Sequence, residues 1–578
     1  MQGSNCLGNF SLVLHGHIPY VLGHGTWPHG SQMLYEAAAD TYLPLLNVVA
    51  KLASEGISAN LTIGLTPVAM EQLDDERFKD WFVGYLNEKV CMAEQNADQF
   101  RDTNNLHLAY LAERWQQHYR NLIHQFCVEY NHDILGEFRR QQDAGNIEVI
   151  TSAATHGYLP LLHEDASVQA QILQGVSTYE KYMGRRPRGC WLPECAYRPR
   201  ADWAPPPHIR GEEIPYPRKG IEEFLSENGF DYFVVDTHLL GGGDPLPVRI
   251  EETDTLGKLW GQIRRVDGPS GDYKSPYRPY FVGSQFEDHP PVVALFRDPE
   301  TSIKVWSGEY GYPGDFDYLD FHKKHIPGDL RYWRVTDERS DLGSKDHWSP
   351  DNAGERAKEH AGNFLWTVKE TLRGNQMHDV EPLVVSPFDA ELFGHWWFEG
   401  IWWIEHVLRW MAEDEEINVT TPSRHLAHND PQEAITLPEG SWGAGGGHWV
   451  WLNEDVDWTW ERIYDAELDM QDLVRHHGRG HDETMQKIMR QAARELLLLQ
   501  ASDWQFLITT KSAPDYAATR IQSHYSDFKK CADLSRRYAR GEWIEQEEWD
   551  DFGAMHDRDN IFDTIDPLWF AQVRHPAG

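Results

Sequence analysis

Short runs of β-branched and apolar residues recur along the first four-fifths of the chain, separated by polar segments. Each run is apolar throughout rather than alternating, which is typical of a strand buried on both faces of a parallel sheet. Two of the intervening segments, residues 36–53 and 168–183, place apolar residues at helical spacing. The runs that we interpret as strands are residues 10–14, 60–63, 147–151, 189–192, 232–235, 292–296 and 383–386.

This alternation predicts an α/β fold with a parallel βα barrel rather than a two-sheet sandwich. Two segments depart from it. Residues 76–142 are polar and helix-prone without a strand run, which predicts a helical insertion. Residues 201–291 contain PPPH, GGGD and GPSGDYKSPYRPY, and Pro and Gly interrupt regular structure. We interpret this second segment as a long loop region that serves as a lid, with a short helix near 219–228.

Beyond about residue 457 the pattern is purely helical, over residues 458–477, 482–499 and 516–540. The sequence therefore predicts a catalytic domain over residues 1–435, which includes the insertion and the loop region. A C-terminal helical domain over residues 436–578 follows, and we expect it to contribute aromatic residues to the cleft.

The net charge of the chain argues against some classes of binding partner. Lys and Arg number 53 and Asp and Glu 91, so the net charge is −38. Such a surface repels phosphate backbones and anionic lipid heads, which argues against nucleic acid and membranes as partners. A neutral, hydroxyl-rich ligand remains compatible, although solubility or salt tolerance would explain the acidity equally well. No apolar run approaches the roughly 18 residues that span a bilayer. The N-terminus also lacks a signal-peptide pattern, so we expect a cytoplasmic protein.

Tryptophan is the compositional anomaly, with 24 residues in 578. An indole needs either a large core or a ligand with flat apolar faces, and pyranose rings have such faces. The six cysteines show no repeated spacing and predict neither a disulfide framework nor a metal site.

Polar side chains follow the ends of several predicted strands, where parallel barrels place their chemistry. Two of them are carboxylates on separate strands, Glu194 and Asp389, with histidines and indoles around them. A carboxylate pair suits glycosidic bond cleavage, in which one group attacks the anomeric carbon and the other protonates the leaving oxygen. The first must be ionised and the second protonated, so their environments have to differ. The strand-end strings are HGHIPY, TSAATHGY, WLPECAY and SPFDAELFGHWW.

Structural explanations compete with the catalytic interpretation of these residues. Glu194 follows a proline and would also suit a helix start, and Asp389 would suit an N-cap. We expect one of His15 and His17 to face a sugar and the other to be structural. A different class of enzyme, a metal-dependent polysaccharide deacetylase, would use His15, His17 and His156 as zinc ligands.

Longer strings resemble the five sequence regions of glycoside hydrolase family 57, and in detail those of its 1,4-α-glucan branching enzymes. The resemblance covers nearly the whole chain, because it extends to VWSGEYGYPGDFDYLDFHKKH, LRYWRVT and the C-terminal WQFLITTKSAPDYA. The five regions correspond to HGHIPY, TSAATHGYLPLL, WLPECAY, FDAELFGHWWFEG and GSWGAGGGHWVWLN.

The resemblance implies an incomplete (β/α)7 barrel with a helical insertion and a C-terminal all-helical domain. It implies that Glu194 is the nucleophile and Asp389 the general acid/base of a retaining reaction, without a metal or organic cofactor. The residues that it places around the sugar are His15, His156, Trp306, Trp442 and Trp451.

The expected activity is 1,4-α-glucan branching, with amylose, amylopectin or glycogen as donor and acceptor. An α-amylase or a 4-α-glucanotransferase shares the same covalent intermediate and remains an alternative, as does a catalytically silent glucan-binding protein. Arg297 is a candidate for substrate contact or for a simple ion pair, and Tyr273 is a candidate lid aromatic. We interpret the glycine-rich residues 443–447 as a tight segment that lets Trp442 and Trp451 reach the cleft.

Overall fold

The computed structural model describes most of the chain, including both expected domains. Tyr273 and much of the expected lid, residues 242–273 and 284–289, lie outside the described residues. The described ranges are 6–211, 213–241, 274–283, 290–307, 311–337, 339, 341–480 and 482–571.

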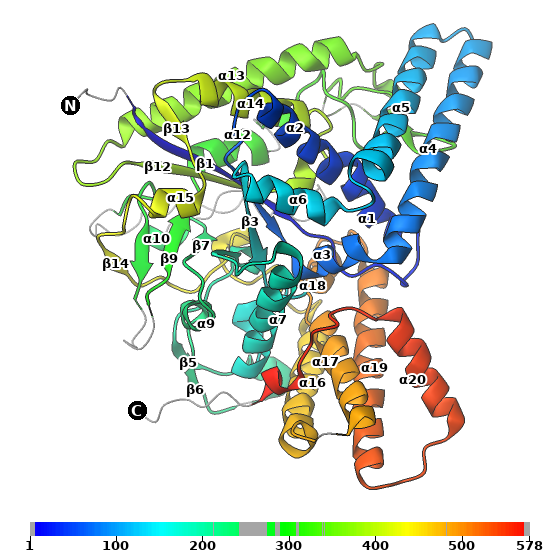
Figure 1. The fold of residues 1–578 in the computed structure, drawn as a ribbon, viewed down its shortest axis with the longest axis vertical. Coiled ribbons are helices and arrows are strands. Elements are labelled where there is room, and N and C mark those ends of the chain that lie inside the picture. The colour runs from blue at the N-terminus through cyan, green and yellow to red at the C-terminus, as the bar shows by residue number, and fades with distance from the viewer. Residues whose placement is uncertain are drawn as a thin grey trace.

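A single curved sheet forms the centre of the molecule (Figure 1). Its seven parallel strands run in the order β12-β1-β2-β3-β4-β7-β9. Among the described residues, the two ends of this order meet at an isolated bridge, where Arg297 pairs with Val385 just beyond β9. The predicted incomplete (β/α)7 barrel is therefore confirmed. The strands are β1 (Gly8–Gly16), β2 (Leu61–Leu65), β3 (Ile147–Ser152), β4 (Gly189–Trp191), β7 (Tyr232–Val235), β9 (Val293–Phe296) and β12 (Leu383–Asp389).

Burial explains why the strands read as continuous apolar runs. All nine residues of β1 are buried, because the barrel interior covers one face and helices cover the other. Three short strands extend the sheet: β13 (Ile417–Val419) pairs with β1, β8 (Tyr280–Val282) with β9, and β14 (Ala434–Ile435) with β8. The surrounding helices include α1 (Ser31–Ala37), α2 (Leu43–Ser54), α3 (Pro67–Asp74), α7 (Asp165–Met183), α12 (Pro299–Trp306), α13 (Pro350–Gly374), α14 (Gly400–Glu413) and α15 (Pro422–Leu426).

Two long helices occupy most of the range expected for the insertion. Helices α4 (Glu76–Asp102) and α5 (Leu106–His124) pack side by side and project from the barrel at the upper right of Figure 1. Helix α6 (Ile134–Asp143) instead packs on β3 and α7, so the end of residues 76–142 lies in the helical layer of the barrel.

The described part of residues 201–291 is more regular than a loop. Strands β5 (Ala201–Trp203) and β6 (Tyr216–Arg218) form an antiparallel pair that the Pro-rich sequence did not predict. The expected short helix is present as α9 (Ile221–Glu227). Two single-turn helices, α8 (Pro207–Arg210) and α10 (His238–Gly241), complete this part.

Five helices form the C-terminal region, which lies below the barrel in Figure 1. Three were expected, and α18 and α20 were not. Helix α19 packs against α16, α17 and α18. Their bounds are α16 (Asp457–His477), α17 (Glu483–Leu499), α18 (Asp503–Thr509), α19 (Pro514–Ala539) and α20 (Gln546–Arg558).

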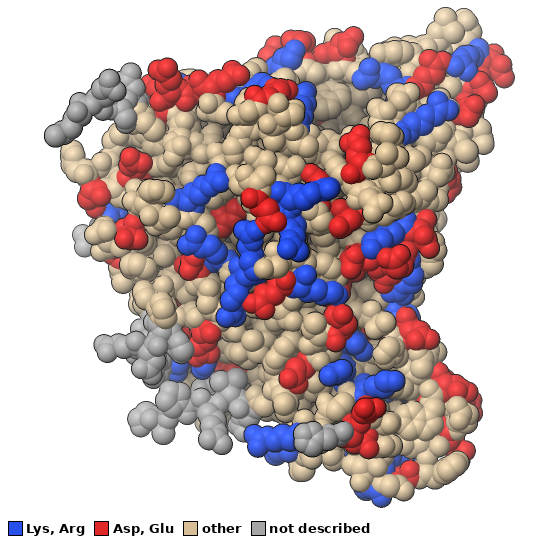
Figure 2. Space-filling model, viewed as in Figure 1, with Lys and Arg blue, Asp and Glu red and all other residues tan. Residues whose placement is uncertain are grey.

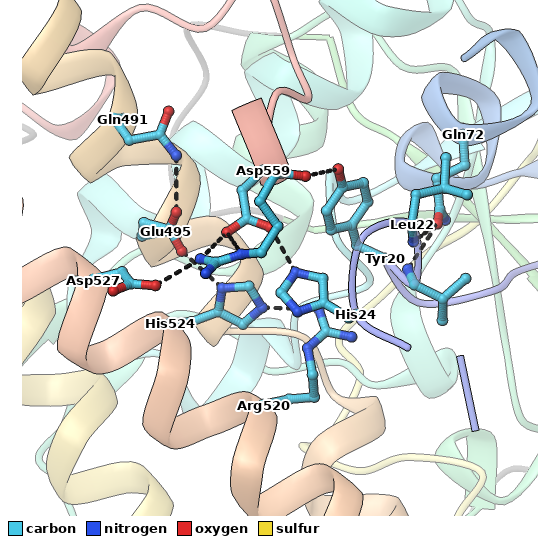
Figure 3. A network of polar contacts seen from close by, with 12 residues as sticks. Tyr20, Leu22, His24, Gln72, Gln491, Glu495, Arg520, His524, Asp527 and Asp559 are labelled. Carbon is cyan, nitrogen blue, oxygen red and sulfur yellow. Dashed lines mark hydrogen bonds and ion pairs between the residues drawn. The ribbon is translucent and has the colours of Figure 1, made fainter. Parts of the chain in front are cut away.

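A buried polar network fastens these helices to the loop that follows β1 (Figure 3). From that loop, His24 Nε2 lies 2.6 Å from Asp559 Oδ1, beyond the end of α20. Arg558 donates to Asp527 on α19 at 2.6 Å, and His524 Nδ1 lies 2.7 Å from Glu495 on α17. This loop continues directly from the end of β1, where His15 and His17 lie. The network therefore fixes the C-terminal helices close to the barrel face that carries these two histidines.

Acidic and basic side chains are interspersed over the face shown in Figure 2. Many of the basic groups pair with a carboxylate, as Arg409 does with Glu405. Among the described residues, no helix is long and apolar enough to cross a bilayer.

Candidate active site

Glu194 lies three residues beyond the end of β4, in a single 3₁₀ turn (Pro193–Cys195). Its φ is 60° and that of Cys195 is 47°, a left-handed conformation that costs a non-glycine residue about 1–3 kcal/mol. The surroundings enforce this turn, because Trp442 N–H donates to Glu194 O at 3.1 Å and Tyr197 N–H to Gly440 O at 2.8 Å. A strained, externally held turn of this kind is typical of a functional side chain.

The carboxyl of Glu194 faces hydrogen-bond donors. Trp442 Nε1 donates to Oε2 at 2.8 Å, and His156 Nδ1 lies 3.8 Å from Oε1. Burial raises the pKa of Glu194 to about 7, and the hydrogen bond from Trp442 limits the rise. The side chain is 16% exposed, so it lines an opening rather than the sealed core.

Asp389 is the last residue of β12 and lies in register with His15 of β1. Burial raises the pKa of Asp389 well above its usual range, and the charges of Glu194 and Glu391 raise it further, while Arg297 opposes them. Within the described part of the chain, no donor hydrogen-bonds to this carboxyl. The charges of Glu194 and Asp389 therefore interact, and a hydrogen-bond donor contacts the first carboxyl while like charges act on the second.

His15 and His156 lie between β1 and the loop after β3. Their Nε2 atoms are 3.0 Å apart, and the His15 ring stacks on Trp191 at 4.5 Å and 5°. His156 Nδ1 is 2.9 Å from Ser502 Oγ. Burial lowers the pKa of both imidazoles well below the usual value, and neighbouring histidines lower it further, so both rings are neutral at pH 7.

His17 belongs to the site as well, although the sequence suggested that one of the two histidines is structural. Its Nε2 lies 3.0 and 3.1 Å from the two carboxylate oxygens of Asp503, the first residue of α18. Its Nδ1 lies 3.0 Å from Thr66 Oγ1, and its backbone N–H donates to Glu391 Oε1 at 3.0 Å. Glu391 also accepts a hydrogen bond from Tyr42.

The three expected aromatic residues differ in how they are placed. Trp442 and Trp306 are 5% and 6% exposed, and their rings meet edge to face at 6.1 Å. Trp451 is 1% exposed and stacks on Tyr158 at 4.5 Å, behind Gly443. Tyr158 and Gly443 cover the ring of Trp451, and its role in holding a glucose ring stays a prediction.

Arg297 forms the ion pair that the sequence left open as one of two options. It is 0% exposed and donates to Asp236, and its guanidinium lies 5.6 Å from the ring of Trp442. The charge of Arg297 lowers the pKa of Asp389, and its guanidinium packs against the indole of Trp442. Arg297 therefore acts on the site although it is fully buried.

A metal ion does not suit this arrangement of histidines. Ligand atoms of His17, His156 and Asp503 fall within 4.8 Å of one another. The rings of His17 and His156, however, stack at 4.1 Å and 20°, so their in-plane nitrogen lone pairs run nearly parallel instead of converging as tetrahedral coordination requires. Both nitrogens of each ring are already hydrogen-bonded to protein groups.

Ser502 and Asp503 were missed by sequence reasoning. They lie between the buried run that ends α17 and the buried Trp504, and a polar pair in such a position is the one signal that would have marked them. Ser502 N–H donates to His156 O at 3.2 Å, and Gly157 pairs with Ala501 as an isolated bridge. The C-terminal region thus reaches the active face through the turn between α17 and α18.

Comparison with known proteins places the chain in a family. Residues 11–438 match Glycosyl hydrolase family 57, and residues 462–570 match the 1,4-alpha-glucan branching enzyme C-terminal family. The chain is 41% identical over 561 residues to a 1,4-alpha-glucan branching enzyme of Thermococcus kodakarensis, covering 96% of this chain and 78% of the relative.

Solved structures give the same result. A crystal structure of a branching enzyme of this family from Thermococcus kodakaraensis, in complex with glucose, superposes with a TM-score of 0.87 at 39% identity, over 99% of this chain and 98% of that one. The α-amylase AmyC from Thermotoga maritima superposes with a TM-score of 0.78 at 28% identity, over 98% and 100%. Because the family match spans most of the chain, the protein belongs to glycosyl hydrolase family 57.

Proposed function

We propose that this chain is a 1,4-α-glucan branching enzyme in which Glu194 is the nucleophile and Asp389 the general acid/base. The observation that carries the proposal is that burial raises the pKa of both carboxyls, but the hydrogen bond from Trp442 limits the rise at Glu194, whereas the charges of Glu194 and Glu391 add to it at Asp389. The match of residues 462–570 to a branching-enzyme C-terminal family supports branching as the outcome.

In the first step, ionised Glu194 attacks the anomeric carbon of an α-1,4-linked glucose. The bond from that carbon to the glycosidic oxygen breaks, and Asp389 gives its proton to the leaving oxygen. The raised pKa of Asp389 keeps this proton in place at neutral pH, whereas Glu194, with a pKa of about 7, is ionised in about half of the molecules at pH 7. The donor chain is then held as a glycosyl ester on Glu194.

In the second step, Asp389 accepts the proton of a glucan 6-hydroxyl, and the hydroxyl oxygen attacks the same carbon and releases Glu194. Two inversions retain the α configuration and create an α-1,6 branch. Water in place of the acceptor gives hydrolysis, so the indoles of Trp442 and Trp306 would favour transfer by keeping the pocket dry.

An α-amylase is the second candidate, because the Thermotoga maritima α-amylase AmyC shares the fold at 28% identity and the chemistry up to the ester is common. The deacetylase alternative is disfavoured by the stacked, hydrogen-bonded histidines. We extend the proposal to a cytoplasmic, glycogen-type polymer as the natural substrate, which analysis of the polymer in cells lacking the enzyme would test.

Linkage analysis of the product from pure amylose tests the activity. We expect new α-1,6 linkages, measured by ¹H NMR and by the chains that a debranching enzyme releases, with few new reducing ends. Reducing ends without α-1,6 linkages would identify an amylase, and conserved reducing ends with redistributed linear chains would identify a 4-α-glucanotransferase.

Two substitutions test the assignment of roles. Glu194→Gln and Asp389→Asn keep the shape of each side chain and remove its charge or its proton relay, so each is expected to lower activity by about 10³-fold or more, within the 10²–10⁴-fold range for acid–base catalysis. Unchanged thermal unfolding would show that the fold is intact. Activity within a few-fold of wild type in either variant would refute the assignment.

A further inference from the structure

His17 is held from three sides in the pocket and has no part in the two-carboxylate mechanism. Both carboxylate oxygens of Asp503 contact the Nε2 of His17, and Thr66 Oγ1 contacts its Nδ1. The backbone N–H of His17 donates to Glu391 Oε1. Its ring stacks on His156 at 4.1 Å, and His156 in turn lies 3.8 Å from Glu194. The side chains of His17 and Asp503 are 11% and 16% exposed, so both reach the edge of the pocket.

The charged groups around this ring favour a cation. Burial alone would lower the pKa of His17, but the carboxylates of Asp503, Glu391 and Glu194 together outweigh it, so the pKa is raised overall. The other titratable groups facing it, His15 and His156, are neutral and contribute no opposing charge at pH 7.

We propose that Asp503, supplied by the C-terminal helical region, holds His17 as an imidazolium beside the pocket, and that this positive charge offsets the effect of the Asp503 carboxylate on the ionisation of Glu194. The inference rests on the proposed role of Glu194 as the nucleophile. His17 and Asp503 are positioning residues in this scheme, because they act through Glu194 and not on the reacting atoms.

The two members of the pair act on Glu194 with opposite signs. The negative charge of Asp503 raises the pKa of Glu194, and the positive charge of His17 lowers it. Removal of His17 alone therefore leaves an uncompensated carboxylate beside the nucleophile and raises its pKa. Removal of both charges leaves a neutral pair, so the second substitution should repair the effect of the first.

A double-mutant cycle measures this compensation. His17→Gln, Asp503→Asn and the double variant are compared by the pH dependence of amylose cleavage, scored as loss of iodine colour so that hydrolysis and transfer both count. We expect His17→Gln to move the acidic limb of kcat/KM upward by roughly one unit, the low end of the range for a nearby charge. In the double variant the limb should return to within a few tenths of a unit of wild type.

Asp515→Asn is the matched control, because this exposed aspartate lies in the first turn of α19, away from His17. It should leave the profile unchanged. An acidic limb that stays shifted in the double variant, or that never moves in His17→Gln, would overturn the inference. A purely structural role for the pair would give a double variant at least as impaired as either single one at every pH.

A readout independent of activity covers the case in which His17→Gln fails to fold. NMR of histidine-labelled protein should show His17 protonated at pH 7 in wild type and neutral in Asp503→Asn. A neutral His17 in wild type would also overturn the inference. If wild type forms no α-1,6 linkages while the limb shifts as expected, the proposed branching function fails and this inference stands.

Discussion

Replacing Trp442 with phenylalanine removes one hydrogen bond to Glu194 and keeps an aromatic ring in the wall of the pocket. The indole Nε1 donates to Glu194 Oε2 at 2.8 Å, while the backbone bond from Trp442 N–H to Glu194 O does not depend on the side chain. The variant therefore perturbs the charge state of the nucleophile more than the turn that presents it.

The magnitude follows from the strength of the bond. A hydrogen bond to a charged acceptor contributes about 1.5–3 kcal/mol, and one pKa unit corresponds to about 1.4 kcal/mol. Loss of the donor disfavours the ionised form, so the pKa of Glu194 should rise from about 7 by roughly one to two units. At pH 7 the ionised fraction would then fall about five-fold for one unit and about fifty-fold for two.

The assay is kcat/KM for amylose cleavage between about pH 5 and pH 10, where the acidic limb reports the nucleophile of the free enzyme. Trp306→Phe is the matched control, since within the described residues the Trp306 indole N–H has no hydrogen-bond partner, so it loses ring area without losing a donor to Glu194. We expect the acidic limb to move upward in Trp442→Phe alone. A limb that stays in place, or one that moves equally in both variants, would refute the reasoning.

Three further predictions concern the surroundings of the pocket. Trp442→Ala opens the wall to water and should raise the ratio of new reducing ends to α-1,6 linkages; an unchanged ratio would contradict the water-exclusion role. Gly443→Ala places a Cβ 2.5 Å from the ring of Trp451, so Tm should fall by a few degrees in a thermal melt. Burial alone would raise the pKa of Asp559, but hydrogen bonds and charges from its partners lower it overall. The ionised carboxylate therefore stabilises the folded state above about pH 4, and this stabilisation is lost as pH falls. Asp559→Asn should thus lower Tm at pH 7 and flatten its dependence on pH in the acidic range.

The barrel strands could be predicted because burial on both faces leaves an unambiguous sequence pattern, as in β1. Strands β5 and β6 could not, since each has only three residues and the pair includes partly exposed positions. Helix α18 is only seven residues long, and α20 buries little more than Met555, so neither has a wide apolar face from which to recognise it.

The two carboxylates of the site could be located because each follows a strand whose end must reach the same barrel face. Asp503 could not, because it meets His17 across 486 positions of sequence and no local pattern predicts such a contact. Trp442 and Trp451 are nine residues apart in one aromatic segment. Sequence alone does not say which of the two rings lies beside Glu194. In the structure the indole of Trp442 donates to Glu194, whereas the ring of Trp451 packs behind Gly443.

The difference between the two carboxyls arises from different parts of the chain. Burial is the largest cause of the raised pKa of Asp389, and the charges that shift it further come from groups on or near barrel strands. Burial also raises the pKa of Glu194, and the hydrogen bonds that lower it come from Trp442 and Ser502, both beyond residue 435, while Asp503 raises it and His17 lowers it. The barrel thus supplies a pair of acids, and the following segment supplies the hydrogen-bond donors that limit the rise of the pKa at Glu194. Residues on both sides of the predicted boundary at residue 435 therefore contribute to the site, and the network around His24 and Asp559 holds the C-terminal helices against the loop that follows β1.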